Sequence, residues 1–343
     1  MPQPFALRRF QQLPSFSHHE AGSHVGVPAE RAFGEHVDQT NYSVVVGDQV
    51  VVKWLTPPAP MPHPSLDVLA HLVEAGFKET APPYAALTLR EKSGEVLLAL
   101  ITGYLPEARD GWEWCVDEAE GGRTAFAGDL GRLAADLHLA LATLPGTDTA
   151  GGPLRASARA ERALEEALDL TGGEDGRWLA SRAGDLAREL APLTTPITTP
   201  LIRIHGDLHV GQILRWRDGY AVIDFDGNPT VTEAEPYQPA ARDLAQLTTS
   251  LEHVAQVAVK RRGTPPGRAA GWARTARGRL LAAYRGRLVE RGRPDLLDES
   301  LIRPFEIEQE CRELIYAARH LPRWRYAPMG VLRARYPDPE ETP

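Results

Sequence analysis

The sequence predicts an α+β protein in which a small β-rich N-terminal lobe precedes a large α-helical C-terminal lobe. Before residue 106, β-branched runs alternate with short polar turns, as in a small sheet. After residue 106, apolar residues recur at helical spacing over most of the chain. We therefore expect lobes spanning 1–105 and 106–343.

The composition favours a protein with a substantial core and no nucleic-acid or membrane partner. The chain has 343 residues, 43% of them apolar, and a net charge of −8. That charge disfavours non-specific binding to nucleic acid or to an anionic membrane. No apolar stretch approaches the ~20 residues of a membrane helix, and two cysteines fit a reducing, cytoplasmic location.

The first lobe is expected to contain two hairpins and one helix. Residues 1 to about 40 show no period and predict a loosely structured entry or small cap. Two valine runs around a Gly-Asp-Gln turn predict a hairpin over 42–55. The prolines from 57 to 64 predict a break, and Ser65 then caps a helix that ends at Glu74. Short strands follow at 88–90 and 96–101.

The second lobe is expected to be helical. Leucines at 130, 133, 137 and 141 form an apolar stripe at helical spacing. The expected helices are 112–118, 124–144, 156–170, 178–190, 240–260, 270–291 and 303–320.

The run from Ile202 to Gln212 carries the strongest functional signal. Asp207 follows an apolar approach and lies in a glycine-containing turn that exposes a carboxylate. It suits a base or orienting group for a hydroxyl nucleophile in phosphoryl transfer. The alternative is a turn or helix-capping residue, but His205-Gly206 before it and Gln212 after it favour function.

Asp224 ends a second apolar strand. A strand-end carboxylate is suited to hold Mg²⁺ against phosphates, whereas the alternative is a turn residue that caps the strand. Asp226 points the same way if the strand continues. Its role stays open among metal binding, sugar binding and a solvated loop.

Lys53 is one of four lysines and lies in an apolar strand. A buried ammonium needs an anion, and we expect phosphate and the carboxylate of Asp67 on the next helix. The alternative is an edge-strand lysine that prevents aggregation. The chain has no glycine-rich phosphate loop, so Gln39 and Asn41 before the hairpin are the candidate phosphate cover, with an ordinary turn as the alternative.

The last expected helix is dense in charge and is followed by aromatic residues. Aromatic rings beside carboxylates commonly hold sugars by stacking and hydrogen bonds. The alternative is a solvated helix face. The expected acceptor contacts are His209, Glu308, Arg312, Glu313 and Trp324, together with Asp207.

These motifs resemble the aminoglycoside phosphotransferase superfamily of protein-kinase-like enzymes, and more closely its maltokinase branch. The resemblance implies a two-lobed kinase-like fold that binds ATP and Mg²⁺, with the nucleotide in the N-terminal lobe near Lys53. It implies Asp207 as the catalytic aspartate and Gln212 and Asp224 as Mg²⁺ ligands. Residues 103–106 resemble the hinge, which implies adenine near Thr102 and Tyr104. The similarity covers roughly residues 35 to 330.

The last helix departs from the maltokinase pattern. A lysine of that pattern is Gln309 here, while neighbouring carboxylates are retained. Losing a cation beside retained carboxylates favours a cationic acceptor, and the pattern resembles actinobacterial glucosamine kinases. The expected reaction converts glucosamine to glucosamine 6-phosphate. The alternatives are a maltokinase, an aminoglycoside phosphotransferase or a non-catalytic pseudokinase that binds a partner. A monomer is favoured.

Overall fold

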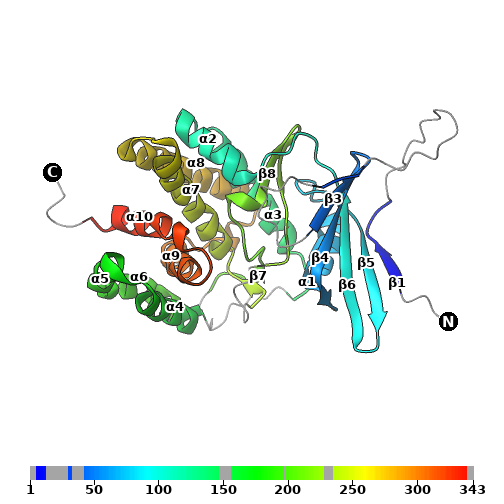
Figure 1. Cartoon of the computed structure of the whole chain (residues 1–343), viewed down its shortest axis with the longest axis horizontal. Coiled ribbons are helices and arrows are strands. Elements are labelled where there is room, and N and C mark those ends of the chain that lie inside the picture. Colours follow the sequence, from blue (N-terminus) through cyan, green and yellow to red (C-terminus); the bar gives the residue numbers. More distant parts are fainter. Residues whose placement is uncertain are drawn as a thin grey trace. The chain divides into compact units, whose positions relative to one another are not determined.

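The computed structural model describes residues 5–12, 30–32, 42–146, 156–195, 198–227 and 235–337, which form two compact units (Figure 1). Unit 1 spans Met1–Ala108 with Leu214–Asp226, and unit 2 spans Arg109–Ile213 with Gly227–Pro343. The expected division at residue 106 placed 214–226 with the helices. The structure instead places this segment in unit 1, because its strand hydrogen-bonds there.

Unit 1 is built around a six-stranded antiparallel sheet with the strand order β1-β5-β6-β4-β3-β2. Leu66 from the helix packs with Ala86 and Leu97 from the sheet to form a buried cluster. The elements are β1 (Phe5–Arg9), β2 (Glu30–Ala32), β3 (Tyr42–Val46), β4 (Val50–Pro60), α1 (Pro64–Glu74), β5 (Pro83–Glu91), β6 (Gly94–Gly103), β8 (Ile213–Trp216) and β9 (Gly219–Val222).

Three expectations for this unit are wrong. The segment from residue 1 to about 40 contains two strands, β1 and β2. All five residues of β1 are exposed, so the sequence of β1 shows no alternation of apolar and polar residues that would predict a strand. Strand β4 continues to Pro60 instead of breaking at Pro57. Its pairing with β3 ends at Trp54, so the later prolines need only one strand neighbour, β6. Helix α1 begins at Pro64, and Ser65 hydrogen-bonds His63 at 2.6 Å rather than capping the helix.

Unit 2 is mainly helical, and its two-stranded sheet pairs β7 with β10. The expected helices are confirmed, except that 178–190 is divided into two. The elements are α2 (Gly111–Gly121), α3 (Phe126–Leu141), α4 (Ala156–Leu170), α5 (Gly173–Ser181), α6 (Ala183–Leu190), β7 (Ile202–Arg203), β10 (Tyr237–Gln238), α7 (Ala241–Arg262), α8 (Pro266–Glu290), α9 (Ile302–Arg319) and α10 (Tyr326–Arg335), with short 3-10 helices that include Val210–Gln212.

The core of unit 2 lies where α3 packs against α8. The predicted leucine stripe on α3 is buried, and Tyr284 of α8 is fully buried beside it. Burying one such leucine contributes about 2 kcal/mol. This packing fixes α3 and α8, which in turn support the polar side chains described below.

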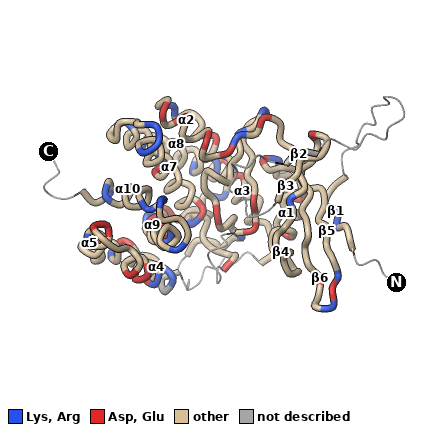
Figure 2. The backbone as a smooth tube through the Cα atoms, in the orientation of Figure 1, with Lys and Arg blue, Asp and Glu red and all other residues tan. Residues whose placement is uncertain are grey.

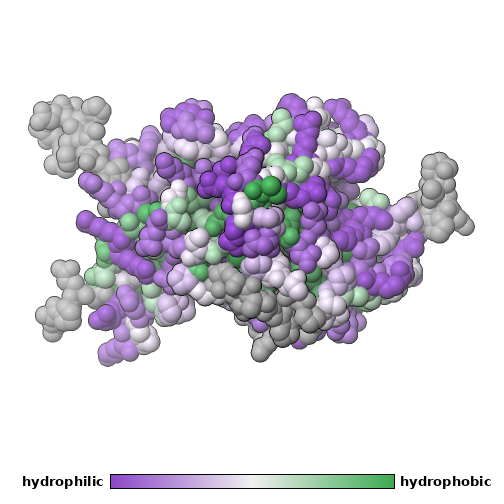
Figure 3. Space-filling view, turned by 180° about the vertical axis from the view of Figure 1, so that it is seen from behind, coloured by the Kyte–Doolittle hydropathy of each residue, from purple (hydrophilic) through white to green (hydrophobic). Residues whose placement is uncertain are grey.

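Charged residues of both signs are distributed over the helices (Figure 2). The face drawn in Figure 3 is mainly hydrophilic, with smaller groups of hydrophobic residues. None of the helices in the described ranges has the length and apolar content needed to cross a membrane. Cys115 and Cys311 are buried, and neither forms a disulfide bond.

Candidate active site

The loop that carries Asp207 leaves β7 and enters the short helix Val210–Gln212. Gly206 has a φ of +84°, in the left-handed region that favours glycine. The turn that it allows is followed at once by Asp207, whose side chain is 14% exposed. A largely buried carboxylate therefore stands at a fixed turn of the backbone.

One face of α7 supports the backbone of this loop. The Asp243 carboxylate accepts hydrogen bonds from the amides of His205 at 2.7 Å and Gly206 at 2.9 Å. Two turns along the helix, Ser250 Oγ accepts the Val210 amide at 3.1 Å. The spacing from 243 to 250 keeps both side chains on one helix face.

The Asp243 carboxylate is itself held in the core. His138 Nε2 lies 3.2 Å from it, and His138 Nδ1 lies 2.6 Å from the Tyr284 hydroxyl. Burial raises the pKa of Tyr284, so its hydroxyl donates to His138 and the opposite imidazole nitrogen donates to Asp243. Burial also acts to raise the pKa of Asp243, but His138 and the loop amide of Gly206 outweigh burial and lower it. His138 is a core histidine, as expected.

The Asp207 carboxylate has a different neighbour at each oxygen. Gln246 Nε2 donates to Oδ1 at 2.7 Å. Gln212 Nε2 lies 3.5 Å from Oδ2, and His209 Nε2 lies 3.7 Å from it. The structure thus brings Asp207, His209 and Gln212 together, as their positions in one loop suggest.

Aromatic rings connect this loop to the last helices. The His209 ring lies 5.8 Å from Trp112, and Trp112 lies 5.7 Å from Trp324. Trp324 Nε1 donates to Glu313 at 2.7 Å, and Gln309 Nε2 donates to the other Glu313 oxygen at 2.9 Å. No Lys or Arg of the described residues forms an ion pair with Glu313. A half-buried carboxylate held by neutral donors is suited to bind a cationic group.

Helix α2 fixes the position of Trp112. Asp110 caps the helix by accepting the amides of Trp112 and Glu113 at 2.8 and 3.2 Å. A Cβ on Gly111 would lie 1.6 Å from the Val210 carbonyl oxygen. The start of α2 therefore lies directly against the Asp207 loop.

Glu308, an expected acceptor contact, is fully buried. Arg242 binds its carboxylate at 2.8 Å and Arg312 binds it at 2.6 Å. Burial acts against ionisation, but the two guanidinium groups outweigh burial and lower the pKa of Glu308 to about 2. Glu308 therefore forms ion pairs with both Arg242 and Arg312, and the guanidinium of Arg312 is already paired in this structure.

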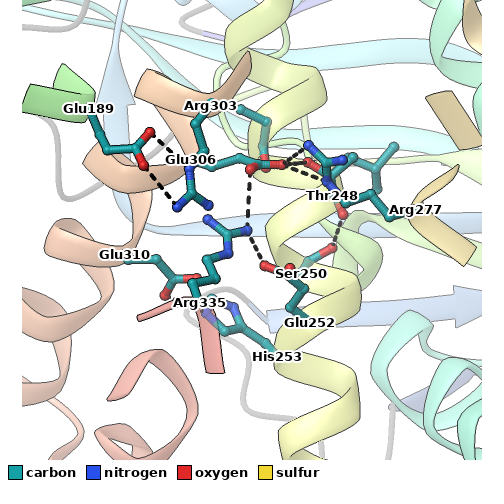
Figure 4. A network of polar contacts seen from close by, with 12 residues as sticks. Glu189, Thr248, Ser250, Glu252, His253, Arg277, Arg303, Glu306, Glu310 and Arg335 are labelled. Atoms are coloured by element: carbon teal, nitrogen blue, oxygen red, sulfur yellow. Dashed lines mark hydrogen bonds and ion pairs between the residues drawn. The ribbon is translucent and has the colours of Figure 1, made fainter. Parts of the chain in front are cut away.

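A second charged network joins four helices (Figure 4). Arg335 of α10 pairs with Glu252 of α7 and, at 3.2 Å, with Glu306 of α9. Glu306 also accepts from Arg277 of α8 at 3.0 Å and from Thr248 of α7 at 2.7 Å. The network fixes α10, which directly follows Trp324 and Arg325.

His253 links this region to the aromatic rings. Its Nε2 lies 3.0 Å from Glu310, and its ring packs edge-on against Trp324 at 5.5 Å. Both His253 and Glu310 are buried. Burial acts to lower the pKa of His253, but Glu310 outweighs burial and raises it.

Unit 1 contains a separate cluster of charged side chains. Lys53 Nζ lies 2.8 Å from Asp224 Oδ1 and 3.1 Å from Asp226 Oδ2. Burial acts to lower the pKa of Lys53, but the two carboxylates outweigh burial and raise it. His63 is close enough for Asp226 and Lys53 to affect it, although burial dominates and lowers the pKa of His63.

The expected ion pair between Lys53 and Asp67 is wrong. The Asp67 side chain is 68% exposed and lies 3.4 Å from Arg8. Asp67 is an exposed partner of Arg8 on β1, and Lys53 pairs instead with the carboxylates of Asp224 and Asp226. Asp226 is therefore not simply a solvated loop residue.

The backbone at Asp224 has an unusual conformation. Its φ is +66°, a conformation that residues other than glycine seldom adopt and that often occurs at functional sites. The preceding strand β9 is anchored by Thr80, whose hydroxyl donates to the Val222 carbonyl at 2.7 Å. The Val222 amide donates to the backbone carbonyl of Glu79 at 2.8 Å.

The chemistry of Asp224 and Asp226 fits a hard cation. Lys53 shows that both carboxylates are arranged around one positive charge. Carboxylate and amide oxygens are the ligands that Mg²⁺ prefers, and Gln212 offers an amide oxygen in unit 2. No group of three or more acidic, His or Cys side chains suited to a metal occurs among the described residues.

The remaining expected nucleotide contacts have different outcomes. Thr102 pairs with Val51 near the end of β6, and the Tyr104 amide donates to Gln49 at 2.9 Å. These two contacts join the end of β6 and the residue after it to β4 and the residue before it. Gln39 and Asn41 lie outside the described residues.

The sequence reasoning did not identify Trp112, Asp243 or Gln246 as functional. Arg242–Ala245 was noted only as a family-like segment. The spacing of Asp243, Gln246 and Ser250 on one helix face is the signal that could have located them. Their loop partners, however, are 37 to 40 residues earlier in the chain.

Comparison with known proteins places the chain among phosphotransferases. A family model described as "Phosphotransferase enzyme family" matches residues 30–227. A glucosamine kinase of Streptacidiphilus jiangxiensis is 42% identical over 310 residues, covering 85% of this chain and 70% of the relative. A glucosamine kinase of Mycolicibacterium smegmatis is 36% identical over 348 residues, covering 96% of this chain and 86% of the relative.

Solved structures agree. A glucosamine kinase in complex with glucosamine, ADP and inorganic phosphate has a TM-score of 0.81 at 36% identity, with 96% of this chain and 81% of that chain covered. A GDP complex of aminoglycoside 2'-phosphotransferase-IIIa has a TM-score of 0.52 at 15% identity, covering 90% and 93%, and shares the fold alone. The expected kinase-like fold is confirmed. This chain belongs to the phosphotransferase enzyme family.

Proposed function

We propose that this protein is an ATP- and Mg²⁺-dependent glucosamine kinase that produces glucosamine 6-phosphate. The relatives at 36 and 42% identity are glucosamine kinases. The observation in this chain that carries the acceptor assignment is the Glu313 carboxylate, which neutral donors hold beside Trp324. The ammonium group of glucosamine can form an ion pair with the Glu313 carboxylate, whose hydrogen-bond donors are neutral, whereas maltose is uncharged.

Asp207 is the proposed catalytic residue. A sugar hydroxyl oxygen forms a bond to the γ-phosphorus of ATP, while the bond from that phosphorus to the bridging oxygen breaks and ADP leaves. Asp207 orients the hydroxyl and receives its proton. His209 and the rings of Trp112 and Trp324 contact the sugar. Arg312 contributes to the sugar site while its charge is paired with Glu308.

The charged cluster of unit 1 serves the nucleotide. Lys53 binds phosphate, and Thr102 and Tyr104 lie at the adenine end. Asp224 and Gln212 are the proposed oxygen ligands of Mg²⁺, with Asp226 as an additional carboxylate. When bound, Mg²⁺ neutralises charge that develops on the phosphate oxygens. The proposed cytoplasmic location is consistent with use of ATP by a protein whose two cysteines form no disulfide bond.

A coupled assay of ADP release tests this function. Glucosamine, maltose and an aminoglycoside are each supplied with ATP and Mg²⁺, and Asp207→Ala serves as the inactive control. We expect glucosamine to give the highest kcat/KM and Asp207→Ala to lower kcat by about 100-fold or more. Faster turnover of maltose would contradict the acceptor assignment. Nucleotide binding without turnover of any acceptor would favour a pseudokinase.

A further inference from the structure

We propose that Gln246 is a positioning residue that fixes the plane of the Asp207 carboxylate, so that Oδ2 faces the residues proposed to bind the acceptor. This inference rests on the proposed kinase function. Gln246 lies on α7 and is 7% exposed, and its Nε2 is 2.7 Å from Asp207 Oδ1.

The chemistry of the two groups determines which atoms meet. An ionised carboxylate only accepts hydrogen bonds, so the amide nitrogen of Gln246 must face Asp207. An amide does not titrate near neutral pH and cannot take the proton itself. Gln246 therefore acts through Asp207, by occupying one oxygen and fixing the plane of the carboxylate.

The second oxygen faces the residues proposed to bind the sugar. Oδ2 lies 3.7 Å from His209 Nε2, and the His209 ring lies 5.8 Å from Trp112. Gln212 Nε2 is 3.5 Å from Oδ2, which is a much weaker contact than the one at Oδ1. Oδ2 is thus the carboxylate oxygen on the side of His209 and the aromatic rings.

The loop itself does not depend on Gln246. Asp243 and Ser250 already bind the loop through the amides of His205, Gly206 and Val210. Gln246 alone among these three α7 side chains bonds the Asp207 side chain. Loss of the Gln246 amide should therefore spare the fold and the loop backbone while releasing the Asp207 carboxylate from its fixed orientation.

Two variants test this role. Gln246→Leu removes the donor at similar volume, and we expect kcat with glucosamine to fall about 10- to 100-fold, with a melting temperature and a KM for ATP close to wild type. Gln246→Glu replaces the donor by a second carboxylate near Oδ1, which repels the Asp207 carboxylate instead of holding it. We expect kcat with glucosamine to fall at least as far as in Gln246→Leu, while the KM for ATP stays close to wild type.

Gln256→Glu is the matched control, because it adds the same charge to α7 near Gly330 rather than near Asp207. It should leave kcat and the KM for ATP unchanged. Wild-type kcat in both Gln246→Leu and Gln246→Glu would overturn the inference. If Gln246→Leu does not fold, the kinetics of Gln246→Glu decide alone. Failure of the proposed function is distinguishable, because the wild-type protein would then not phosphorylate glucosamine.

Discussion

At the residue scale, Lys53 depends on two carboxylates for its charge. Asp224 and Asp226 lie 2.8 and 3.1 Å from its ammonium, and they outweigh the effect of burial. Asp226 gains in return: burial acts to raise its pKa, but Lys53 outweighs burial and lowers it. Lys53 and Asp226 each favour the charged form of the other, which suits contact with phosphate and a divalent cation.

Lys53→Met should therefore weaken nucleotide use. Removing a charge-assisted contact to phosphate costs about 1.5–3 kcal/mol, so we expect kcat/KM for ATP to fall by roughly 10- to 100-fold. Steady-state kinetics with varied ATP measures this effect. Lys92→Met, in the exposed turn after β5, is the control and should retain wild-type values. Equal kinetics in both variants would remove Lys53 from the nucleotide site.

At the element scale, α7 and α9 carry different polar side chains that contact the loop and the aromatic residues of unit 2. Helix α7 holds the Asp207 loop through Asp243, Gln246 and Ser250. Helix α9 presents Glu313 beside Trp324 and buries Glu308 between two arginines. The same helix thus carries one carboxylate suited to an acceptor and one that is structural.

Glu308 makes stability depend on pH in the acidic range. Its pKa falls from 4.5 in the unfolded chain to about 2 in the folded protein. The unfolded state binds more protons between these values, so the stabilisation is complete above pH 4.5 and is lost as the pH falls toward about 2.

Glu308→Gln should lower the free energy of unfolding by about 3 kcal/mol at pH 7, because both arginines lose a buried anion. It should also flatten the pH dependence below 4.5. Urea unfolding at several pH values measures both effects. Glu299→Gln, which removes a half-exposed partner of Arg285, should be nearly neutral. Equal losses in the two variants would contradict a structural role specific to Glu308.

At the scale of the whole molecule, local sequence patterns predict the helices and strands well, but they do not predict which of these elements contact one another. The leucine stripe predicts α3, and the motif around Asp207 predicts the turn that carries this carboxylate, because both signals lie within a few residues. Strand β1 was missed because its side chains are exposed. The partner of Lys53 was missed because Asp224 is 171 residues away and is positioned by the β8–β9 hairpin.

The acceptor side shows the same limit. Glu313 and Trp324 were predicted from a dense charge pattern and a following aromatic cluster. That pattern could not distinguish Glu313 from Glu308, because burial depends on how α9 packs against α7. Trp112 and Gln246 were missed because they reach the Asp207 loop from other helices.

Identification of the phosphorylated product tests the central claim most directly. The purified protein is supplied with ATP, Mg²⁺ and an equimolar mixture of glucosamine, glucose and maltose, and the products are analysed by phosphorus and proton NMR. We expect glucosamine 6-phosphate to form first and to dominate, with little product from the uncharged sugars. Maltose phosphate as the main product, or a phosphate on another hydroxyl of glucosamine, would contradict this account.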